Sequence, residues 1–190
     1  MIPLKYLGLF VALPCLPLQA TEYKVDLSHT SVYFGLAHFE RSQMRGRFNK
    51  IEVKQLQFDG ESGQIDLQID VDSVDSGSRL LDGIIKSEQF LDSKEYPYIR
   101  FQSKQFVFDG KQLQAVHGQL SLHGQTRPLS LQVQRFQCGE IKIVVFKRYV
   151  CGGDFSASIL RSAFGIKQLL PDVGDEVQLQ ISIEALPVSP

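Results

Sequence analysis

Strict alternation of polar and apolar residues is the feature that most constrains how this chain can fold. Residues 64–72 and 177–185 alternate without interruption, and residues 129–133 and 155–159 repeat the pattern. Successive side chains of a β-strand point to opposite faces, so this period of two predicts strands with one buried face and one face in water. Strands of a parallel sheet, buried on both faces, would instead be continuously apolar. The sequence therefore predicts an all-β, antiparallel fold.

The predicted strands follow one another at nearly regular intervals. Apolar-rich segments predict further strands over residues 22–26, 31–38, 45–59, 99–109, 112–123 and 140–146. Turn signals that contain glycine separate the strands at residues 59–63, 109–111, 123–125, 152–153 and 174–175. Eight or more strands at this spacing are typical of a barrel or a sandwich.

Residues 78–96 depart from the strand pattern. Leu80, Leu81, Ile84 and Ile85 recur at the i, i+4 spacing of a helix, and Pro97 would stop that helix. We expect one helix, or a helix followed by a turn, inserted between two strands.

The first 20 residues have the organisation of a secretory signal peptide. Lys5 supplies a positive charge, residues 7–13 form an uncharged apolar run, and Ala20 is a small residue at the expected cleavage site. An uncleaved membrane anchor is the alternative, but Pro14 and Pro17 leave the apolar run short for a membrane span. We therefore expect a single exported domain over residues 21–190.

Two cysteines, Cys138 and Cys151, lie in this expected mature domain. An even number of cysteines in an exported protein favours a disulfide over two free thiols. Residues 139–150 between them are typical of two strand ends and a turn, so the bridge would stabilise a hairpin by about 3 kcal/mol. A zinc site is disfavoured, because no histidine or further cysteine lies at ligand spacing.

Charge and motifs argue against several classes of function. Lys and Arg number 20 and Asp and Glu number 21, so no basic excess is available to bind nucleic acid. The sequence holds no glycine-rich nucleotide-binding motif and no hydrolase nucleophile elbow. His29, His38, His117 and His123 lack the spacing of a helical zinc motif, although two of them could share a strand face.

Phenylalanine is unusually abundant, with 13 residues against no tryptophan. Core packing explains any single one of them. A closed antiparallel barrel of eight strands, however, can hold one small ligand inside. An interior lined with phenylalanine would suit a long apolar molecule.

Several motifs, in order along the chain, resemble those of the YceI-like family. They are DLSHTSVYF (26–34), GRF (46–48), SVDSG (73–77), SEQFLD (87–92), YPYIRFQS (96–103), GQLSLHGQTRP (118–128), RSAFG (161–165) and VGDEV (173–177). Together they cover essentially the whole expected mature chain, which makes the resemblance far more specific than any single motif. Two features depart from the family: Ala163 stands where an acidic residue is common, and the Cys138/Cys151 pair is not general.

The resemblance implies an extended, lipocalin-like barrel of eight antiparallel strands with a short helical insertion around residues 78–96. It implies a soluble periplasmic protein whose tunnel binds a polyisoprenoid or a related long-chain amphiphilic lipid without catalysis. No cofactor is implied, apart from a non-covalently held isoprenoid or isoprenoid quinone. Family members often dimerise, so a homodimer is possible, with an exposed edge strand as its interface. Transient contact with a membrane is also possible for such a carrier.

The resemblance and the inward parity of the strands together suggest the ligand-binding residues. We expect Phe34, Phe48, Phe58, Phe101 and Phe155 to line the tunnel, and Ile84, Ile85 and Phe90 to cover one mouth. Arg161 is expected to contact a ligand headgroup or, like Asp26, Asp82 and Arg127, to be a paired structural charge. Two alternatives to the lipid carrier stay open. One is a quinone- or metal-linked redox or stress accessory protein, and the other is a structural partner with a barrel filled by side chains.

Overall fold

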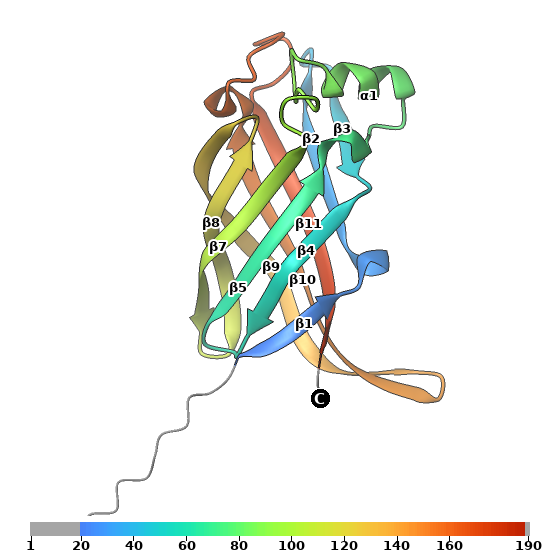
Figure 1. Cartoon of the computed structure of the whole chain (residues 1–190), viewed down its shortest axis with the longest axis vertical. Coiled ribbons are helices and arrows are strands. Elements are labelled where there is room, and N and C mark those ends of the chain that lie inside the picture. Colours follow the sequence, from blue (N-terminus) through green and yellow to red (C-terminus); the bar gives the residue numbers. More distant parts are fainter. Residues whose placement is uncertain (1–19, 189–190) are drawn as a thin grey trace, which may run out of the picture.

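A closed antiparallel barrel of eight strands forms the body of the protein, as the alternation and the resemblance predict. The structure, a computed structural model, describes residues 20–188. Figure 1 shows a tall barrel with a helix at its upper end and a long hairpin at its lower end. The strands are β1 (Thr21–Val25), β2 (Ser31–His38), β3 (Ser42–Phe48), β4 (Ile51–Phe58), β5 (Gly63–Asp70), β6 (Val74–Asp75), β7 (Tyr98–Asp109), β8 (Gln112–Leu122), β9 (Gln125–Ile143), β10 (Phe146–Leu160) and β11 (Glu176–Pro187).

The eleven strands make eight barrel strands, because β1–β2, β3–β4 and β5–β6 each form one interrupted strand. β1 and β2 both pair with β11, one at each end, and the 3₁₀ turn η1 (Leu27–His29) separates them. In the same way, residues 49–50 interrupt a single path from β3 to β4, so the predicted strand over residues 45–59 is two strands. β1 pairs with β4 at the lower end, whereas β2 pairs with β3 at the upper end. Each half of the barrel is thus closed by a different pair.

Glycines let aromatic rings lie against the inner wall. An added Cβ at Gly46 would stand 2.5 Å from Cζ of Phe34, and at Gly118 it would meet the Phe101 ring and collide with the Gln102 carbonyl oxygen. Gly63 lies against the Phe106 ring in the same way. A glycine in a strand often marks such a close approach. Each ring therefore occupies space that a side chain of the neighbouring strand would otherwise fill.

The Gly152-Gly153 pair was expected to form a turn, and this prediction is wrong. Both residues lie inside β10 and pair with β11. A bulge follows them between Asp154 and Phe155, and the Phe155 ring lies against Gly153. Gly153 therefore makes the same close contact with an aromatic ring as the other inner glycines.

The upper end carries the helix α1 (Arg79–Lys86), followed by turns as far as residue 95. The expected insertion over residues 78–96 is therefore a helix followed by turns. The Asp82 carboxylate accepts hydrogen bonds from the Ser76 backbone N–H (2.7 Å) and hydroxyl (2.6 Å), which ties the helix to the segment that enters it. The 3₁₀ turn η3 (Arg161–Phe164) lies at the same end (Figure 1).

The lower end carries the end of the β9–β10 hairpin, residues 139–150, which we name the arm. These residues pair only with one another, because β9 pairs with β8 no further than Gln132 and β10 pairs with β11 no further than Cys151. Residues 144–145 form the turn, so the strand predicted over residues 140–146 ends earlier than expected. The arm projects away from the barrel (Figure 1).

A disulfide joins Cys138 to Cys151 where the arm leaves the barrel. The two cysteines are direct partners in the register of β9 and β10, and their sulfur atoms are 2.01 Å apart. Isolated two-stranded hairpins have marginal stability in water. The cross-link therefore holds the base of the arm where the rest of the sheet no longer supports it.

Replacing Gly118 with Ala is expected to lower the free energy of unfolding by about 1–3 kcal/mol, because the new methyl group would collide with backbone. Gly139→Ala is the matched control, since nothing lies within 4 Å of its added Cβ and its φ is not positive. Urea denaturation followed by circular dichroism measures both variants. Equal stability of the two variants would contradict the close packing of the Phe101 ring against Gly118.

Removing the disulfide through Cys138→Ala/Cys151→Ala is expected to lower the free energy of unfolding by about 3 kcal/mol. A reducing agent should destabilise the wild-type protein by a similar amount and leave the double variant unchanged. The thermal unfolding midpoint, measured with and without reductant, checks both expectations. A wild-type midpoint that does not respond to full reduction would rule out this stabilising role.

Candidate functional site: an apolar cavity in the lower half of the barrel

An apolar cavity of about 50 Å³ lies inside the lower half of the barrel. Its lining comes from seven strands (β4, β5 and β7 to β11) and contains no charged residue. The lining residues are Leu56, Phe58, Ile65, Phe106, Leu113, Val116, Leu131, Phe136, Cys151, Gly152, Gly153, Phe155, Ile183 and Ala185. Such a lining can exclude water and pack against hydrocarbon, but it offers no side-chain acid, base or charge.

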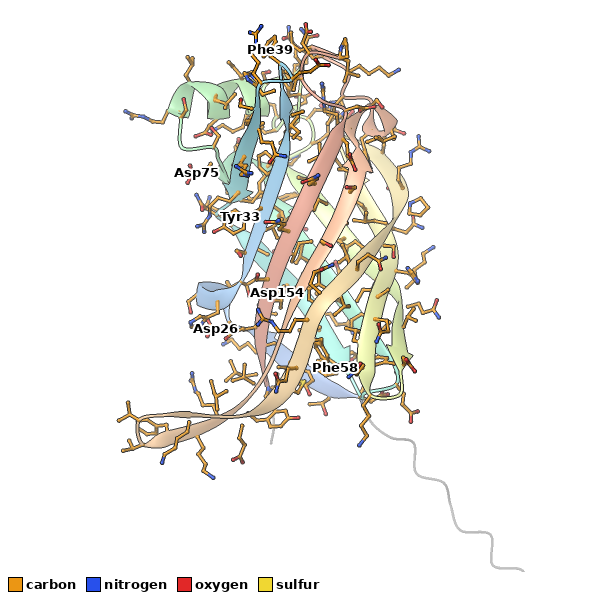
Figure 2. All side chains as sticks on the ribbon, turned by 180° about the vertical axis from the view of Figure 1, so that it is seen from behind. Asp26, Tyr33, Phe39, Phe58, Asp75 and Asp154 are labelled. Atoms are coloured by element: carbon orange, nitrogen blue, oxygen red, sulfur yellow. A yellow bond between two sulfur atoms is a disulfide. The ribbon has the colours of Figure 1, made fainter. Side chains whose placement is uncertain are left out.

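Aromatic rings gather at the lower edge of this cavity. The Phe58 ring stacks on Tyr23 with centroids 4.1 Å apart and meets Phe136 edge-on at 5.6 Å. Phe58 is labelled near the lower end of the barrel in Figure 2. Phe106, Phe136 and Phe155 are only partly buried, although they pack against the core. Apolar surface in this half of the barrel is thus incompletely covered.

The five phenylalanines expected to line a tunnel fall into two groups. Phe58 and Phe155 line the cavity. Phe48 and Phe101 are buried in the core cluster, and Phe34 packs against it with its ring 5.4 Å from that of Phe48. All five belong to the packed interior, but only two of them line the cavity.

The three residues expected to cover a mouth come from the upper end. Ile85 is buried in the core cluster and Phe90 packs against it, whereas Ile84 is 44% exposed. The lining of the cavity includes none of the three. The helix therefore covers the end of the barrel opposite the cavity.

Arg161 is buried and organises the loop that follows η3. Its Nε donates to the carbonyl of Gly174 (2.9 Å), and its Nη2 donates to that of Val173 (2.7 Å). Its Nη1 donates to the carbonyls of Ile166 (3.2 Å) and Gln168 (2.9 Å). Burial lowers the pKa of the guanidinium, while the nearby charge of Asp175 acts in the opposite direction. All three nitrogens are directed at protein carbonyls.

The three charged residues named with Arg161 as expected structural charges also make contacts within the protein. Asp26 caps η1 through the backbone N–H of Ser28 (3.0 Å), and hydrogen bonds from the Ser28 hydroxyl and from His29 help to lower its pKa to about 2. The Asp82 carboxylate accepts a hydrogen bond from the Ser76 hydroxyl, and Nε of Arg127 donates to the carbonyl of Ala163 (3.3 Å). These contacts are structural and lie away from the cavity lining.

Several cavity residues were missing from the expected site, among them Phe106, Phe136, Leu131 and Ile183. The inward parity of Leu131 and Ile183 was readable from the sequence, since both belong to alternating segments. That of Phe106 and Phe136 was not, because each follows a bulge that reverses the alternation of its strand. Parity gives the face on which a side chain lies but not its height along the barrel axis. The bulges in the β7–β8 and β9–β10 pairs shift that height further.

The histidines do not come together into a ligand set. His29 contacts Asp26, whereas Nδ1 of His123 lies 3.0 Å from the Phe164 carbonyl. Within residues 20–188, no group of three His, Cys, Asp or Glu side chains could hold a metal ion. A larger recess of about 260 Å³ lies among Gln57, Gln64, Lys104 and their neighbours, but its lining is mostly polar.

The expected signal peptide, residues 1–20, lies outside the described residues except for Ala20. Over the part of the chain that the structure describes, no helix has the length and apolar character needed to cross a membrane.

Similar proteins share both the sequence and the fold. A UPF0312 protein of Shewanella denitrificans is 28% identical over 185 residues, which is 95% of this chain and 94% of that relative. The solved structure of Burkholderia cenocepacia BcnA superposes with a TM-score of 0.69 at 24% identity, covering 85% of this chain and 99% of that one. A polyisoprenoid binding domain from Saccharophagus degradans superposes with a TM-score of 0.62 at 16% identity, over 88% and 99% of the two chains.

The model of one protein family, described as the YceI-like domain, matches residues 23–185. This range contains every residue that lines the cavity. The chain therefore belongs to the YceI-like family.

Proposed function

We propose that the barrel binds and carries a long-chain isoprenoid or a related amphiphilic lipid, without catalysis, in the periplasm. The observation that carries the proposal is the apolar cavity, whose lining holds no charged residue. The likeness to a Saccharophagus degradans domain described as polyisoprenoid binding supports the same class of ligand. The disulfide between Cys138 and Cys151 suits an oxidising compartment.

The size of the cavity sets a condition on this proposal. Pockets for small-molecule ligands usually enclose roughly 300–1,000 Å³, whereas this cavity encloses about 50 Å³. A long ligand would therefore have to displace side chains. Phe106, Phe136 and Phe155 are the best candidates, because they are only partly buried. Phe34, Phe48 and Phe101 would be reached only by a chain that extends into the upper core.

Hydrophobic transfer is the driving force for such binding. Each methylene removed from water contributes about 0.8 kcal/mol. A chain of many isoprene units could therefore repay the cost of moving several rings without any polar contact. An isoprenoid quinone could place its tail in the same space, and a redox role would then follow from the ligand rather than from the protein.

The small cavity favours one other candidate function. A barrel filled by its own side chains would serve as a structural or stress-response partner and would carry no ligand. The two candidates make opposite predictions about the mass of the purified protein.

The carrier function predicts that the protein purifies with an apolar ligand. The full-length precursor would be expressed in a bacterium, and the mature form purified from the periplasm and analysed by native mass spectrometry, followed by solvent extraction. We expect an added mass that extracts as an isoprenoid. A bare chain, lower in mass by two hydrogens for the disulfide, would instead favour the filled barrel.

Substitutions inside the barrel test where the ligand lies. Phe155→Asp would place a charge against the cavity, and Ile183→Phe would fill the cavity without adding charge, so we expect each to reduce ligand occupancy at least about tenfold. Ser158→Asp, at an exposed position of the same strand, is the matched control for added charge. Full occupancy in an Ile183→Phe protein that melts like the wild type would place the ligand elsewhere.

A further inference from the structure

The arm ends in side chains that a soluble protein rarely exposes together. Val144, Val145 and Phe146 are 83%, 77% and 70% exposed, and they are consecutive in the chain. Ile141 and Tyr149 are also exposed, on the two strands leading to the turn. Figure 2 shows the arm reaching well clear of the barrel, with its side chains projecting away from the rest of the protein. Exposed apolar surface of this kind marks an interaction site.

One residue in the turn of the arm does not favour its backbone conformation. Val144 has a φ of 54°, in the left-handed region. Two-residue hairpin turns place glycine or asparagine at such positions, and a β-branched residue with positive φ is strained. Valine therefore makes this turn less favourable than glycine would. Strained residues of this kind cluster at functional sites.

Cationic residues lie directly behind the apolar tip. Lys142 and Lys147 face each other in the register of the two strands, and Arg148 follows. Like charges opposite each other destabilise a strand pair. Glu140 is the one acidic residue of the arm, and its carboxylate lies 3.3 Å from Lys147 Nζ. The arm therefore carries a positive excess that a further anion would neutralise.

We propose that the arm inserts its tip into an anionic membrane surface and docks the lower end of the barrel there. An apolar tip followed by cations and a tyrosine matches the bilayer interface, where apolar groups enter the acyl region, tyrosine lies at headgroup level and cations contact lipid phosphates. The Cys138–Cys151 disulfide holds the base of the arm against the barrel. Cys151 also lines the cavity, so docking through the arm brings the cavity close to the lipid.

The dimensions of the tip favour a membrane over a second protein chain. A stable protein interface buries roughly 800 Å² on each partner. Three consecutive side chains at the end of a two-stranded ribbon present far less surface than that. The positive excess also opposes pairing of this tip with the same tip of a second copy, whereas an anionic bilayer neutralises it.

The absence of tryptophan from the chain makes a direct test possible. Phe146→Trp places a single tryptophan at the tip, and Leu80→Trp places one at a position of α1 that is 78% exposed at the opposite end. On addition of phosphatidylglycerol/phosphatidylethanolamine vesicles, we expect the emission of the Phe146→Trp protein to shift to shorter wavelength. The emission of the Leu80→Trp protein should not change. Phosphatidylcholine vesicles should give a smaller shift at the tip.

Vesicle flotation separates the apolar and the electrostatic contributions. Val145→Ser/Phe146→Ser should lower the fraction bound to anionic vesicles at least about tenfold, and Lys142→Gln/Lys147→Gln should do so only for anionic vesicles and in a salt-dependent way. Lys94→Gln, an exposed change at the upper end, should leave flotation unchanged. All of these side chains are exposed, so the variants should fold normally.

Three results would overturn the proposal. They are an unchanged emission of the Phe146→Trp protein, an equal shift of the Leu80→Trp protein, and a shift that grows with protein concentration in the absence of vesicles. The last result would identify the tip as a contact between copies of the chain. The proposal does not rest on the carrier function, because vesicle binding is measured whether or not the cavity holds a ligand.

Discussion

Closure of the sheet is the constraint on which the rest of the structure depends. The first strand, β1, hydrogen-bonds to β11 on one side and to β4 on the other, which joins the two edges of the sheet. Once the sheet is closed, all inward side chains share one lumen. The lumen is too narrow for a full set of large side chains at every position, and glycines such as Gly46 and Gly118 make room for the rings of their neighbours. Closure thus explains both the abundance of phenylalanine and the glycines inside strands.

The two ends of the barrel are finished by different kinds of interaction. Polar contacts dominate the upper end. Arg161 donates hydrogen bonds to four backbone carbonyls there, and the Asp82 carboxylate accepts one from the backbone N–H of Ser76, just before α1. A buried guanidinium is expensive to desolvate, and this network compensates it with hydrogen bonds that also fix the loop. The lower end has apolar rings that are only partly covered. A ligand that enters along the axis would therefore meet less resistance from below than from above.

The sequence predicts the strands well because alternation is a local pattern, and the resemblance to a family supplies the closed barrel. The strand over residues 31–38 is found with the expected bounds, and the helix begins within a residue of its expected start. The break at residues 49–50 and the position of Gly152-Gly153 inside β10 were not predictable, since both depend on which strands lie on either side. The site was predictable only in part for the same reason. Alternation shows that Phe48 and Phe58 point inward, but only the strand register shows that Phe58 lies beside the cavity and Phe48 above it.

The disulfide connects the two proposed activities physically. Cys151 is buried against the cavity, and its partner Cys138 is the last residue of β9 before the arm. Without this cross-link, only the strand pairing of residues 139–150 would hold the arm, and a two-stranded ribbon of that length frays easily. A frayed arm could still bind a membrane, but it would not hold the barrel at a defined distance from it. An arm that is cross-linked at its base is therefore better suited to positioning the lower end of the barrel than to anchoring the protein. Positioning is what transfer of an apolar chain between a bilayer and the lumen would require.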